Sequence, residues 1–513
     1  MSAFRKTELT NRRLLPIVLT LLLSACSLAP RYERPEQAMP GHWKNVQLTT
    51  LPLSTDWWVR FQDPVLTSLV EEALKNNQDL AESLARIDSA AAQAGVATSA
   101  LFPFVGAQGS AMSQSVSQRS PNAPPYDATP MSPNRSSTVY QGGIQASWEL
   151  DLWGKYRNQR TMLSDILMST VIRHEALRLA IAGETARQYF TLLALDMQMK
   201  TAERTLKTRQ DAFGIYTSRY KQGDITELDW QRARAEVETA RAQVHSSTRA
   251  VDQAEAALAV LLGCSPRDIM ERAIPRGKGI NVLPAPPVLP AGLPSELLER
   301  RPDIRAAEFM IMANNANIGV ARAQFFPSIS LTGMVGTLSA AFGHLFTNPA
   351  GVWSYGVTGS VPLLDFGYNW YNLKDAEARK NASIAVYRKT VQTAFEDVRT
   401  SFTAQREADA IVKSMQIQVE SLQRSVEIAK LQYDNGYTDY LTVLDAARQL
   451  FQAELQLATA LSNRLNSVVG VCMALGGGWQ DNGERPGFPC INTDKLKGKS
   501  SDSTAALPVA SEQ

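Results

Sequence analysis

The stretch GVATSALFPFVGAQGS, residues 95–110, has a near copy in GVARAQFFPSISLTGM, residues 319–334. The two stretches lie 224 residues apart, and the Phe-Pro pair inside each keeps the same separation. Farther along the chain, Gly154 and Gly367 are separated by 213 residues instead. We therefore predict two copies of one structural unit, with eleven more residues between the Phe-Pro pair and the glycine in the first copy.

The segments beside the Phe-Pro pairs alternate between apolar and small polar residues. In TVYQGGIQASWEL, residues 138–150, the side chains of Tyr140, Ile144 and Trp148 would lie on one face, with glutamines and serine on the other. A period of two is typical of β-strands with one apolar face. We predict strands at about residues 101–113, 138–150, 326–338 and 351–364, with the Pro/Ser/Asn-rich stretch 117–137 as the loop of the first hairpin.

Two very long stretches contain no proline, residues 155–265 and 363–485. Proline costs about 3 kcal/mol inside a helix, so its absence over such lengths favours long helices. Gly223 and Gly436 would supply the turns between them. An apolar heptad seam from Ile384 to Tyr433 indicates coiled-coil packing. We predict two helical hairpins, with helices at about residues 155–221, 226–262, 369–434 and 439–470.

The N-terminus has the pattern of an export signal. Basic residues precede the apolar run LLPIVLTLLL, which is too short to span a membrane as a helix. The following LSAC resembles the bacterial lipobox, whose cysteine is acylated and becomes the first mature residue. This resemblance implies a signal peptide at residues 1–25, lipidation of Cys26 and, from Ser27 beside it, delivery to the outer membrane. The alternative is an ordinary secreted protein with an unmodified cysteine.

The composition offers little for catalysis or nucleic-acid binding. Loss of residues 1–25 removes four basic residues and one acidic residue, so the formal charge falls from +2 to −1 and gives no electrostatic argument for a nucleic-acid partner. The four histidines are dispersed, and no common catalytic motif is present. We expect no enzyme activity, no cofactor and no metal site. Cys472 and Cys490 could form a disulfide in an oxidising compartment or remain separate thiols.

Four strands with one apolar face cannot stand alone in a membrane. An open sheet would leave unpaired edges in lipid, and the smallest membrane barrels use about eight strands. Closure therefore requires several chains, with two copies giving about eight strands and three giving about twelve. The residues themselves leave this choice open. A soluble sandwich beside a coiled coil is the alternative.

Several phrases, in order along the chain, resemble one known family: SLAPRYERP, SALFPFVG, SWELDLWGKYRN, ERRPDIRAAE and YDNGYTDYLTVLDAARQ. Over residues 26–479 the chain is similar to the outer-membrane efflux lipoproteins related to TolC and OprM, the NodT-type outer-membrane factors. The resemblance implies an α+β membrane protein, a homotrimer whose twelve-stranded β-barrel is continuous with a twelve-helix periplasmic α-barrel. It also implies an exit duct for drugs or other small toxic compounds, with a periplasmic adaptor (membrane fusion) protein and an inner-membrane pump as partners and no cofactor.

The same resemblance implies a gate at the periplasmic end of the duct. By distance from the turn glycines, the gate falls on Asp445, Leu441, Asp229 and Tyr433. Asp445 and Leu441 lie one helical turn apart, so an acidic ring and an apolar ring could line one constriction. For Asp229 and Tyr433, a capping or solvent-exposed role is the alternative. Thr438 stands where some family members have an arginine that bonds to the acid.

We expect the chain to divide into six parts: a signal peptide at 1–25, a lipid-anchored and equatorial segment at 26–78, repeat 1 at 79–266, a linker at 267–302, repeat 2 at 303–479 and a polar, disordered tail at 480–513. The adaptor is expected to dock around the helix turns at Gly223 and Gly436. The protein would be anchored in and span the outer membrane and extend into the periplasm. The alternative function is an acylated coiled-coil scaffold of the cell envelope, and the alternative cargo is a metal ion or a secreted protein.

Overall fold

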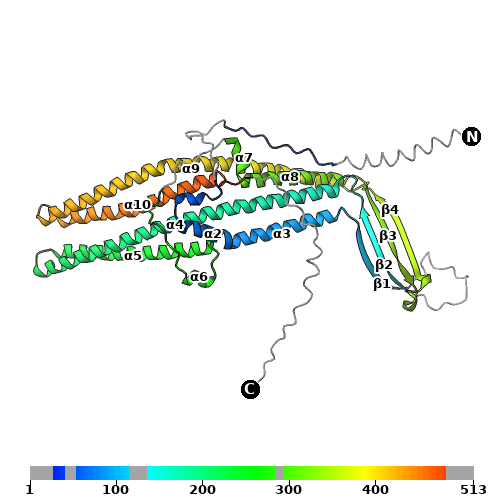
Figure 1. Cartoon of the computed structure of the whole chain (residues 1–513), viewed down its shortest axis with the longest axis horizontal. Helices are drawn as coiled ribbons and strands as arrows, with labels where there is room; N and C mark the ends of the chain where they lie inside the picture. The colour runs from blue at the N-terminus through cyan, green and yellow to red at the C-terminus, as the bar shows by residue number, and fades with distance from the viewer. Residues whose placement is uncertain (1–26, 41–53, 116–135, 285–293, 481–513) are drawn as a thin grey trace, which may run out of the picture.

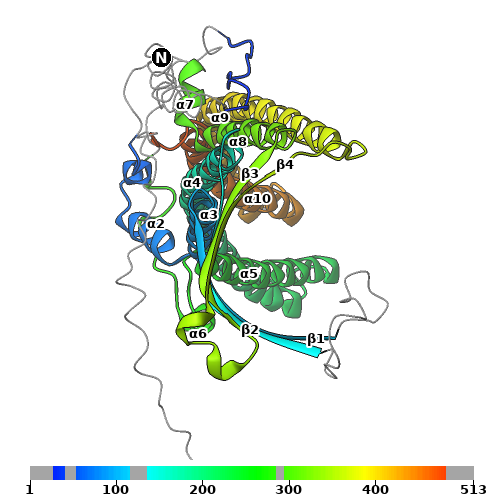
Figure 2. The same ribbon diagram turned by 90° about the vertical axis from the view of Figure 1, so that its right-hand side faces the viewer.

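The computed structural model describes residues 27–40, 54–115, 136–284 and 294–480. The molecule is elongated, with a four-stranded sheet at one end and two long helical hairpins that reach the other end (Figure 1). Viewed along the long axis, the sheet and the helices follow one curved wall (Figure 2). Within the described residues, we find no helix that is both long enough and apolar enough to cross a membrane.

Four antiparallel strands form the sheet in the order β1-β2-β3-β4. β1 and β3 begin after Pro103 and Pro327, and therefore later than the sequence predicted, because proline has no N–H group for the ladder. β4 ends at Ser360 and not at residue 364, ahead of Pro362, for the same reason. The bounds are β1 (Phe104–Ser115), β2 (Ser136–Glu149), β3 (Ser328–Ser339) and β4 (Gly351–Ser360).

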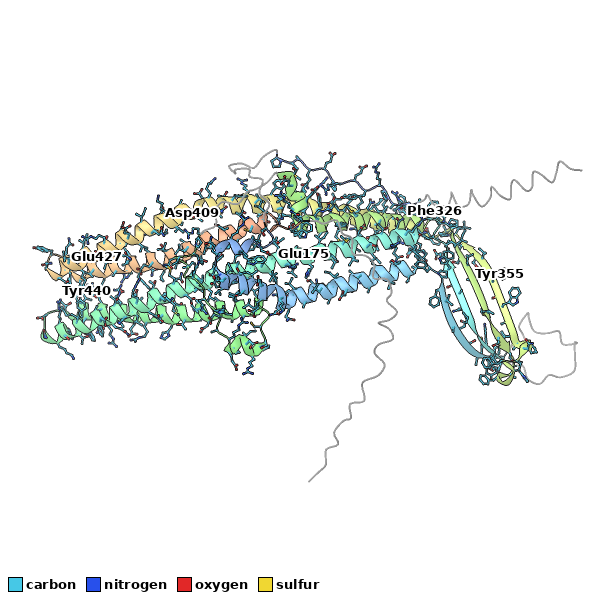
Figure 3. The ribbon with its side chains drawn as sticks, viewed as in Figure 1. Glu175, Phe326, Tyr355, Asp409, Glu427 and Tyr440 are labelled. Atoms are coloured by element: carbon cyan, nitrogen blue, oxygen red, sulfur yellow. The ribbon has the colours of Figure 1, made fainter. Side chains whose placement is uncertain are left out.

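One face of the sheet carries large apolar side chains that none of the described residues covers. Ile144 and Val335 pair across β2 and β3, and their side chains are 53% and 60% exposed. On β4 the rings of Trp353 and Tyr355 stack with centroids 5.6 Å apart, and Tyr355, labelled in Figure 3, is 82% exposed. A monomeric soluble protein rarely exposes such a patch, so this face requires an apolar environment.

The long helices form two hairpins. Helix α4 (Lys155–Gln222) packs against α5 (Glu227–Leu261), and α9 (Tyr368–Asp434) packs against α10 (Tyr440–Ala474). The turns contain Gly223 and Gly436, whose φ angles of 82° and 78° suit only glycine without strain. The side chains of Thr226 and Asp439 cap the returning helices. Helix α10 continues four residues beyond the predicted end at residue 470.

The seam of α9 differs from the predicted heptad at one step. Its buried residues include Tyr387, Val391, Ala394, Val398, Val412 and Val419. Between them the sequence pattern placed Ser401 in the seam, but Ser401 is half-buried and its neighbour Phe402 is buried. A helix of 3.6 residues per turn drifts by about 20° per heptad against a strict seven-residue repeat. That drift turns the next side chain inward.

Shorter elements gather around the middle of the molecule and at the ends of the sheet. The main core lies in the middle, where Trp57, Phe61, Tyr189 and Phe190 are buried. The Tyr189 hydroxyl donates to the Asp63 carboxylate at 2.8 Å. The shorter helices are η1 (Trp57–Phe61), α2 (Pro64–Asn76), α3 (Gln78–Ser99), α6 (Pro266–Glu271), η2 (Pro294–Glu296), α7 (Leu297–Arg300), α8 (Pro302–Ala323), η3 (Phe342–His344) and η4 (Asn348–Ala350).

The two halves of the chain repeat one another element by element. Helices α3 and α8 both have 22 residues and are offset by 224, and α5 and α10 both have 35 residues and are offset by 213. The hairpins also share one register. Phe104 pairs with Ser147, and the same two offsets convert this pair into Ser328 and Ser360, which pair in the second hairpin. The duplicated sequence therefore corresponds to a duplicated backbone.

Candidate functional site

The tips of the two helical hairpins lie beside each other at the end farthest from the sheet (Figure 1). Three tyrosines from three helices meet near these tips. The Tyr216 ring lies 4.1 Å from the Tyr440 ring and 6.4 Å from the Tyr433 ring, measured between centroids. Tyr440 is labelled in Figure 3 near the far end of the helices. The cluster joins α4 to α9 and α10, so it connects the two hairpins of one chain.

Hydrogen bonds fix the hydroxyl groups of this cluster. The Arg219 guanidinium donates to the Tyr433 hydroxyl at 3.4 Å, and the Tyr216 and Tyr433 hydroxyls also bond to each other. Burial raises the pKa of Tyr216 above its ordinary value, and the bond to Tyr433 raises it further. Burial likewise raises the pKa of Tyr440. Tyr216 and Tyr440 therefore remain neutral at physiological pH, and the cluster acts as an apolar contact with polar ends.

Asp445 takes part in a chain of charges that crosses three helices. Its carboxylate lies 3.9 Å from the Arg448 guanidinium, on the next turn of α10. Arg448 also bonds to Glu236 of α5 at 2.6 Å, and Glu236 lies 3.3 Å from Arg209 of α4. The Glu236 side chain is only 13% exposed, so its charge is poorly screened. Its hydrogen bond, and then its charge, raise the pKa of Arg448.

Asp229 has the local contacts of a helix cap. The Thr226 hydroxyl donates to the Asp229 carboxylate at 2.8 Å, and the Asp229 backbone N–H donates back to that hydroxyl oxygen at 3.2 Å. The Asp229 carboxylate also lies 3.6 Å from Arg232 on the same helix. Thr226 is thus the N-cap of α5, and Asp229 bonds to this capping residue from the first turn. The structure thus gives Asp229 the contacts of the capping alternative.

The turn before α10 also bonds locally. The Thr438 hydroxyl donates to the Thr442 hydroxyl at 3.0 Å, and Asp439 caps the helix through the Thr442 backbone N–H at 3.1 Å. The bonds from Thr442 lower the pKa of Asp439. Leu441, one turn before Asp445, is 40% exposed. Leu441 and Asp445 are therefore both available on the surface of a single chain.

The structure adds charged residues that the sequence did not single out, namely Arg209, Glu236 and Arg448. Arg448 could have been found, because it follows Asp445 at the i+3 spacing of helical ion pairs. Glu236 could not, because its partners come from two other helices. Tyr216 was missed for the same reason, since only the packing of the hairpins brings it to Tyr433.

A second cluster holds the N-terminal strap, residues 27–40, against α8. Arg34 and Tyr32 donate to the Glu308 carboxylate at 2.7 and 3.0 Å, and Arg305 approaches it at 2.6 Å. Burial opposes ionisation of Glu308, but the hydrogen bonds and charges of Arg34 and Arg305 hold its pKa below the usual value. Glu308 is therefore a buried anion with several donors.

Farther along the strap, the contacts approach the sheet end of α8. Asn315 donates to the Pro30 carbonyl at 2.6 Å, and Arg322 donates to the Leu28 carbonyl at 3.2 Å. Because Glu308, Asn315 and Arg322 are seven residues apart, they lie along one side of the helix. The strap therefore runs antiparallel to α8 and ends near the sheet. Cys26 itself lies outside the described residues.

The described part of the chain contains two cysteines and no cluster of metal ligands. No group of three or more histidine, cysteine or acidic side chains there could hold a metal ion. Cys472 is buried, and burial raises the pKa of its thiol to about 12. Cys490, with which it could form a disulfide or remain a separate thiol, lies outside the described residues. Cys264 is half-buried, and its sulfur lies 3.4 Å from the Arg272 guanidinium.

Comparison with known proteins identifies the family. A match to the outer membrane efflux protein family covers residues 69–264 and 293–477, one range in each half of the chain. The chain belongs to this family. The resemblance predicted from the sequence is thereby confirmed. Membership places this efflux protein in the outer membrane and among transport proteins.

Two relatives and one solved structure illustrate the similarity. The solvent efflux pump outer membrane protein SrpC of Pseudomonas putida is 33% identical over 477 residues, which cover 91% of this chain and 98% of SrpC. The antibiotic efflux pump outer membrane protein ArpC of Pseudomonas putida is 33% identical over 481 residues, covering 92% and 96%. The CmeC outer membrane channel of Campylobacter jejuni aligns with a TM-score of 0.83 at 26% identity, over 90% of this chain and 97% of CmeC.

Proposed function

We propose that this efflux protein is the exit duct of a tripartite pump, through which drugs, solvents or other small toxic compounds leave the cell. The observation that carries the proposal is that the sheet and the long helices form one continuous curved wall. A sheet with an exposed apolar face continues into helices that extend far beyond it (Figures 1 and 2). The relatives named for solvent and antibiotic efflux supply the class of cargo.

The duct would be closed by three copies of the chain. In the described sheet, β1 and β4 each have one unpaired edge, and such edges are not tolerated in lipid. Pairing β4 of one copy with β1 of the next would give a barrel of about twelve strands from three chains. The four long helices of each chain would continue this barrel as a helical tunnel across the periplasm.

The remaining partners follow from the ends of the molecule. A periplasmic adaptor would dock in the grooves around the turns at Gly223 and Gly436, and it would connect the duct to an inner-membrane pump. At the other end, acylation of Cys26 would anchor the protein in outer-membrane lipid. The path of the strap supports this anchor, because Leu28 is bonded to Arg322 at the sheet end of α8.

The tips would close the duct at rest. In a trimer, Asp445 and Leu441 would form one acidic ring and one apolar ring of three residues each. Three carboxylates at a narrow neck repel one another unless cations bridge them, and Arg448 at 3.9 Å supplies such a cation within each chain. Tyr433 would hold the two hairpins together through Tyr216 and Arg219. Asp229 would act mainly as a helix cap that supports this arrangement.

Single-channel conductance in a planar bilayer tests the duct and the gate together. Wild type should insert as a channel of low conductance, and Asp445→Ala should raise the conductance several-fold because the contact of the Asp445 carboxylate with Arg448 at the closed tips is lost. Asp409→Ala is the matched control, since Asp409 is an exposed carboxylate on α9 away from the tips (Figure 3). Equal conductance of wild type and Asp445→Ala would remove Asp445 from the gate. Absence of conductance from inserted protein would reject the duct and favour the scaffold.

A further inference from the structure

Inside one chain, the second half covers a junction of the first half. Where β2 leads into α4, the Trp153 ring stacks on the Phe326 ring with centroids 4.8 Å apart. The Trp153 indole N–H also donates to the Pro327 carbonyl at 2.7 Å. One step earlier, the Leu150 backbone N–H donates to the Ile329 carbonyl at 2.8 Å. This contact joins repeat 1 to repeat 2 at the base of the sheet (Figure 3).

The same junction exists in the second half, but no residue that the structure describes covers it. The 213-residue offset converts Trp153 into Phe366 and Leu150 into Leu363. Both are among the most exposed apolar residues of the described chain, at 89% and 92%. The 224-residue offset converts Phe326 into Phe102, which is 66% exposed. The chain therefore carries both halves of a second contact of this type, at opposite edges of the sheet.

The offsets are reliable guides to structure because they preserve backbone pairing. Applied to the first hairpin, they reproduce the register of the second without a shift. They can therefore be applied to the β2–β3 pair, which joins the two halves. In that pair Ile144 lies opposite Val335. Adding 213 to Ile144 gives Val357 on β4, and subtracting 224 from Val335 gives Ala111 on β1. These are the two strands with unpaired edges.

We infer that a second copy of this chain completes the pattern in a specific register. Val357 of one copy lies opposite Ala111 of the next, and Phe366 of one copy stacks on Phe102 of the next. This inference rests on the proposed closed assembly and gives it a residue-level interface. The same contact that joins repeat 1 to repeat 2 then joins one chain to its neighbour.

Side-chain size supports this register. On the apolar face of the sheet, β4 presents Trp353, Tyr355 and Val357, whereas the register brings opposite them Ser115, Ser113 and Ala111 of β1. Large side chains thus meet small ones at every step. A shift by one residue would instead turn the apolar side chains of one strand to the opposite face.

The helices give an independent line of support. Inside the chain, Gln198 of α4 donates to the Leu455 carbonyl of α10 at 3.2 Å. Adding 213 to Gln198 gives Ile411 of α9, and subtracting 213 from Leu455 gives Ala242 of α5. The equivalent contact therefore places Ile411 of one copy against Ala242 of the next. Likewise Arg204, which bonds to Glu454 at 2.6 Å, becomes Ile417. These isoleucines are 49% and 55% exposed in the single chain, as expected for a contact surface whose partner is another copy.

Disulfide cross-linking tests the register. Opposite residues in an antiparallel pair have Cα atoms about 4.5–5.5 Å apart, within the range that a disulfide spans. In a background of Cys264→Ser and Cys490→Ser, the pair Ala111→Cys with Val357→Cys should give covalent dimers and trimers after mild oxidation. Cys472 can remain because it is buried. The full-length acylated protein is used in membranes, before any detergent is added.

Three matched pairs serve as controls. Val357→Cys with Gly109→Cys keeps the face but shifts the register by two residues, and Val357→Cys with Met112→Cys points to opposite faces. Neither should cross-link efficiently. Ile144→Cys with Val335→Cys should form a disulfide within one chain, because these residues pair in the structure. That pair should leave the mass of the polypeptide unchanged and shows that oxidation reaches the sheet.

The outcomes separate the register from the proposed function. Preferential cross-linking of the Gly109 or Met112 pair, in protein that still forms a channel, would overturn the register and leave the duct intact. No cross-link in any inter-chain pair, with a channel present and the Ile144 control oxidised, would overturn the interface. A monomeric protein without conductance would reject the assembly itself.

The aromatic contact has its own test in variants that fold. Phe366→Ala and Phe102→Ala should each lower the temperature at which the trimer dissociates in mild detergent. The double variant should dissociate at about the same temperature as the less stable single variant, because each substitution alone already removes the stack. Phe346→Ala is the control, since Phe346 is 82% exposed but lies beyond the strands, between β3 and β4. Simple additivity of the two losses would contradict a direct stack.

Discussion

Glu308 illustrates how one buried charge can organise a segment far away in sequence. Its side chain is 3% exposed, and it binds Tyr32 and Arg34 of the strap across more than 270 residues of chain. A buried carboxylate is tolerated only when donors surround it. The acid is therefore the fixed point to which the strap is tied.

Replacement of this acid should weaken the strap. Glu308→Gln keeps the shape but removes the charge, so we expect a loss of about 2 kcal/mol from the charge-assisted bonds to Arg34 and Arg305. Thermal melting and limited proteolysis of the strap would measure the change. Glu299→Gln alters an exposed acid nearby and should have no effect. Equal melting of the two variants would contradict the assigned role.

The same residue predicts a dependence on pH. Because the folded-state pKa of Glu308 is lowered, its contribution to stability is complete above the ordinary value of 4.5 and is lost as pH falls through the folded value. Wild type should therefore lose melting temperature below about pH 4.5, more steeply than Glu308→Gln. Parallel melting curves for the two proteins across this range would count against the prediction.

Glu236 connects the two hairpins through a hydrogen-bonded ion pair with Arg448. It is held between Arg209 and Arg448, which come from different helices. Glu236→Gln should loosen the link between α5 and α10 and raise the conductance of the proposed duct. Glu238→Gln is the control, because Glu238 is exposed and, among the described residues, bonds to Arg241 on its own helix. A lower conductance in Glu236→Gln would show that the bridge holds the duct open instead.

At the scale of elements, much of the fold could be predicted from where proline and glycine occur. The proline-free stretches predicted the long helices, and the turn glycines predicted where these helices end. Both signals are reliable because proline and glycine act on the local backbone. The strand ends were less accurate, since the predicted period of two continued past the prolines at 103, 327 and 362. Tertiary contacts such as Glu236 with Arg448 could not be predicted, because they depend on how helices dock.

Two glycines in the long hairpins should respond to alanine in opposite directions. Gly436 has a φ of 78°, so Gly436→Ala should destabilise the turn by about 1 kcal/mol. Gly214 lies inside α4 with a helical backbone and open space around it, so Gly214→Ala should stabilise by about 0.5–1 kcal/mol. Comparison of apparent melting temperatures would check both signs. A stabilising Gly436→Ala would mean that the turn has a different backbone.

At the scale of the whole molecule, the duplication explains why a single chain has one covered and one exposed copy of the same contact. Each unit has an aromatic junction; within the described residues the junction at Trp153 is covered by Phe326, and the one at Phe366 is exposed. The sequence alone predicted the copies and the need for closure. The register could be argued only after the observed pairing of β2 with β3 was known.

The proposed anchor predicts a modification at the sheet end of the molecule. Cells supplied with labelled palmitate should incorporate it into wild type but not into Cys26→Ala. Cys264→Ala is the control, because Cys264 lies in the middle of the molecule near Arg272 and should leave the label unchanged. Label retained in Cys26→Ala would move the acylated position elsewhere in the chain.

The strap has a mechanical consequence. It runs antiparallel to α8, and its bonds to Arg322, Asn315 and Glu308 are spaced along the helix axis. A pull on the N-terminus along that axis loads all of these bonds at once in shear, whereas a sideways pull would break them one after another, as a zip opens. The proposed assembly would connect two membranes, so a load between them would act mainly along its length. The strap is therefore strongest in the direction in which tension between the membranes would act.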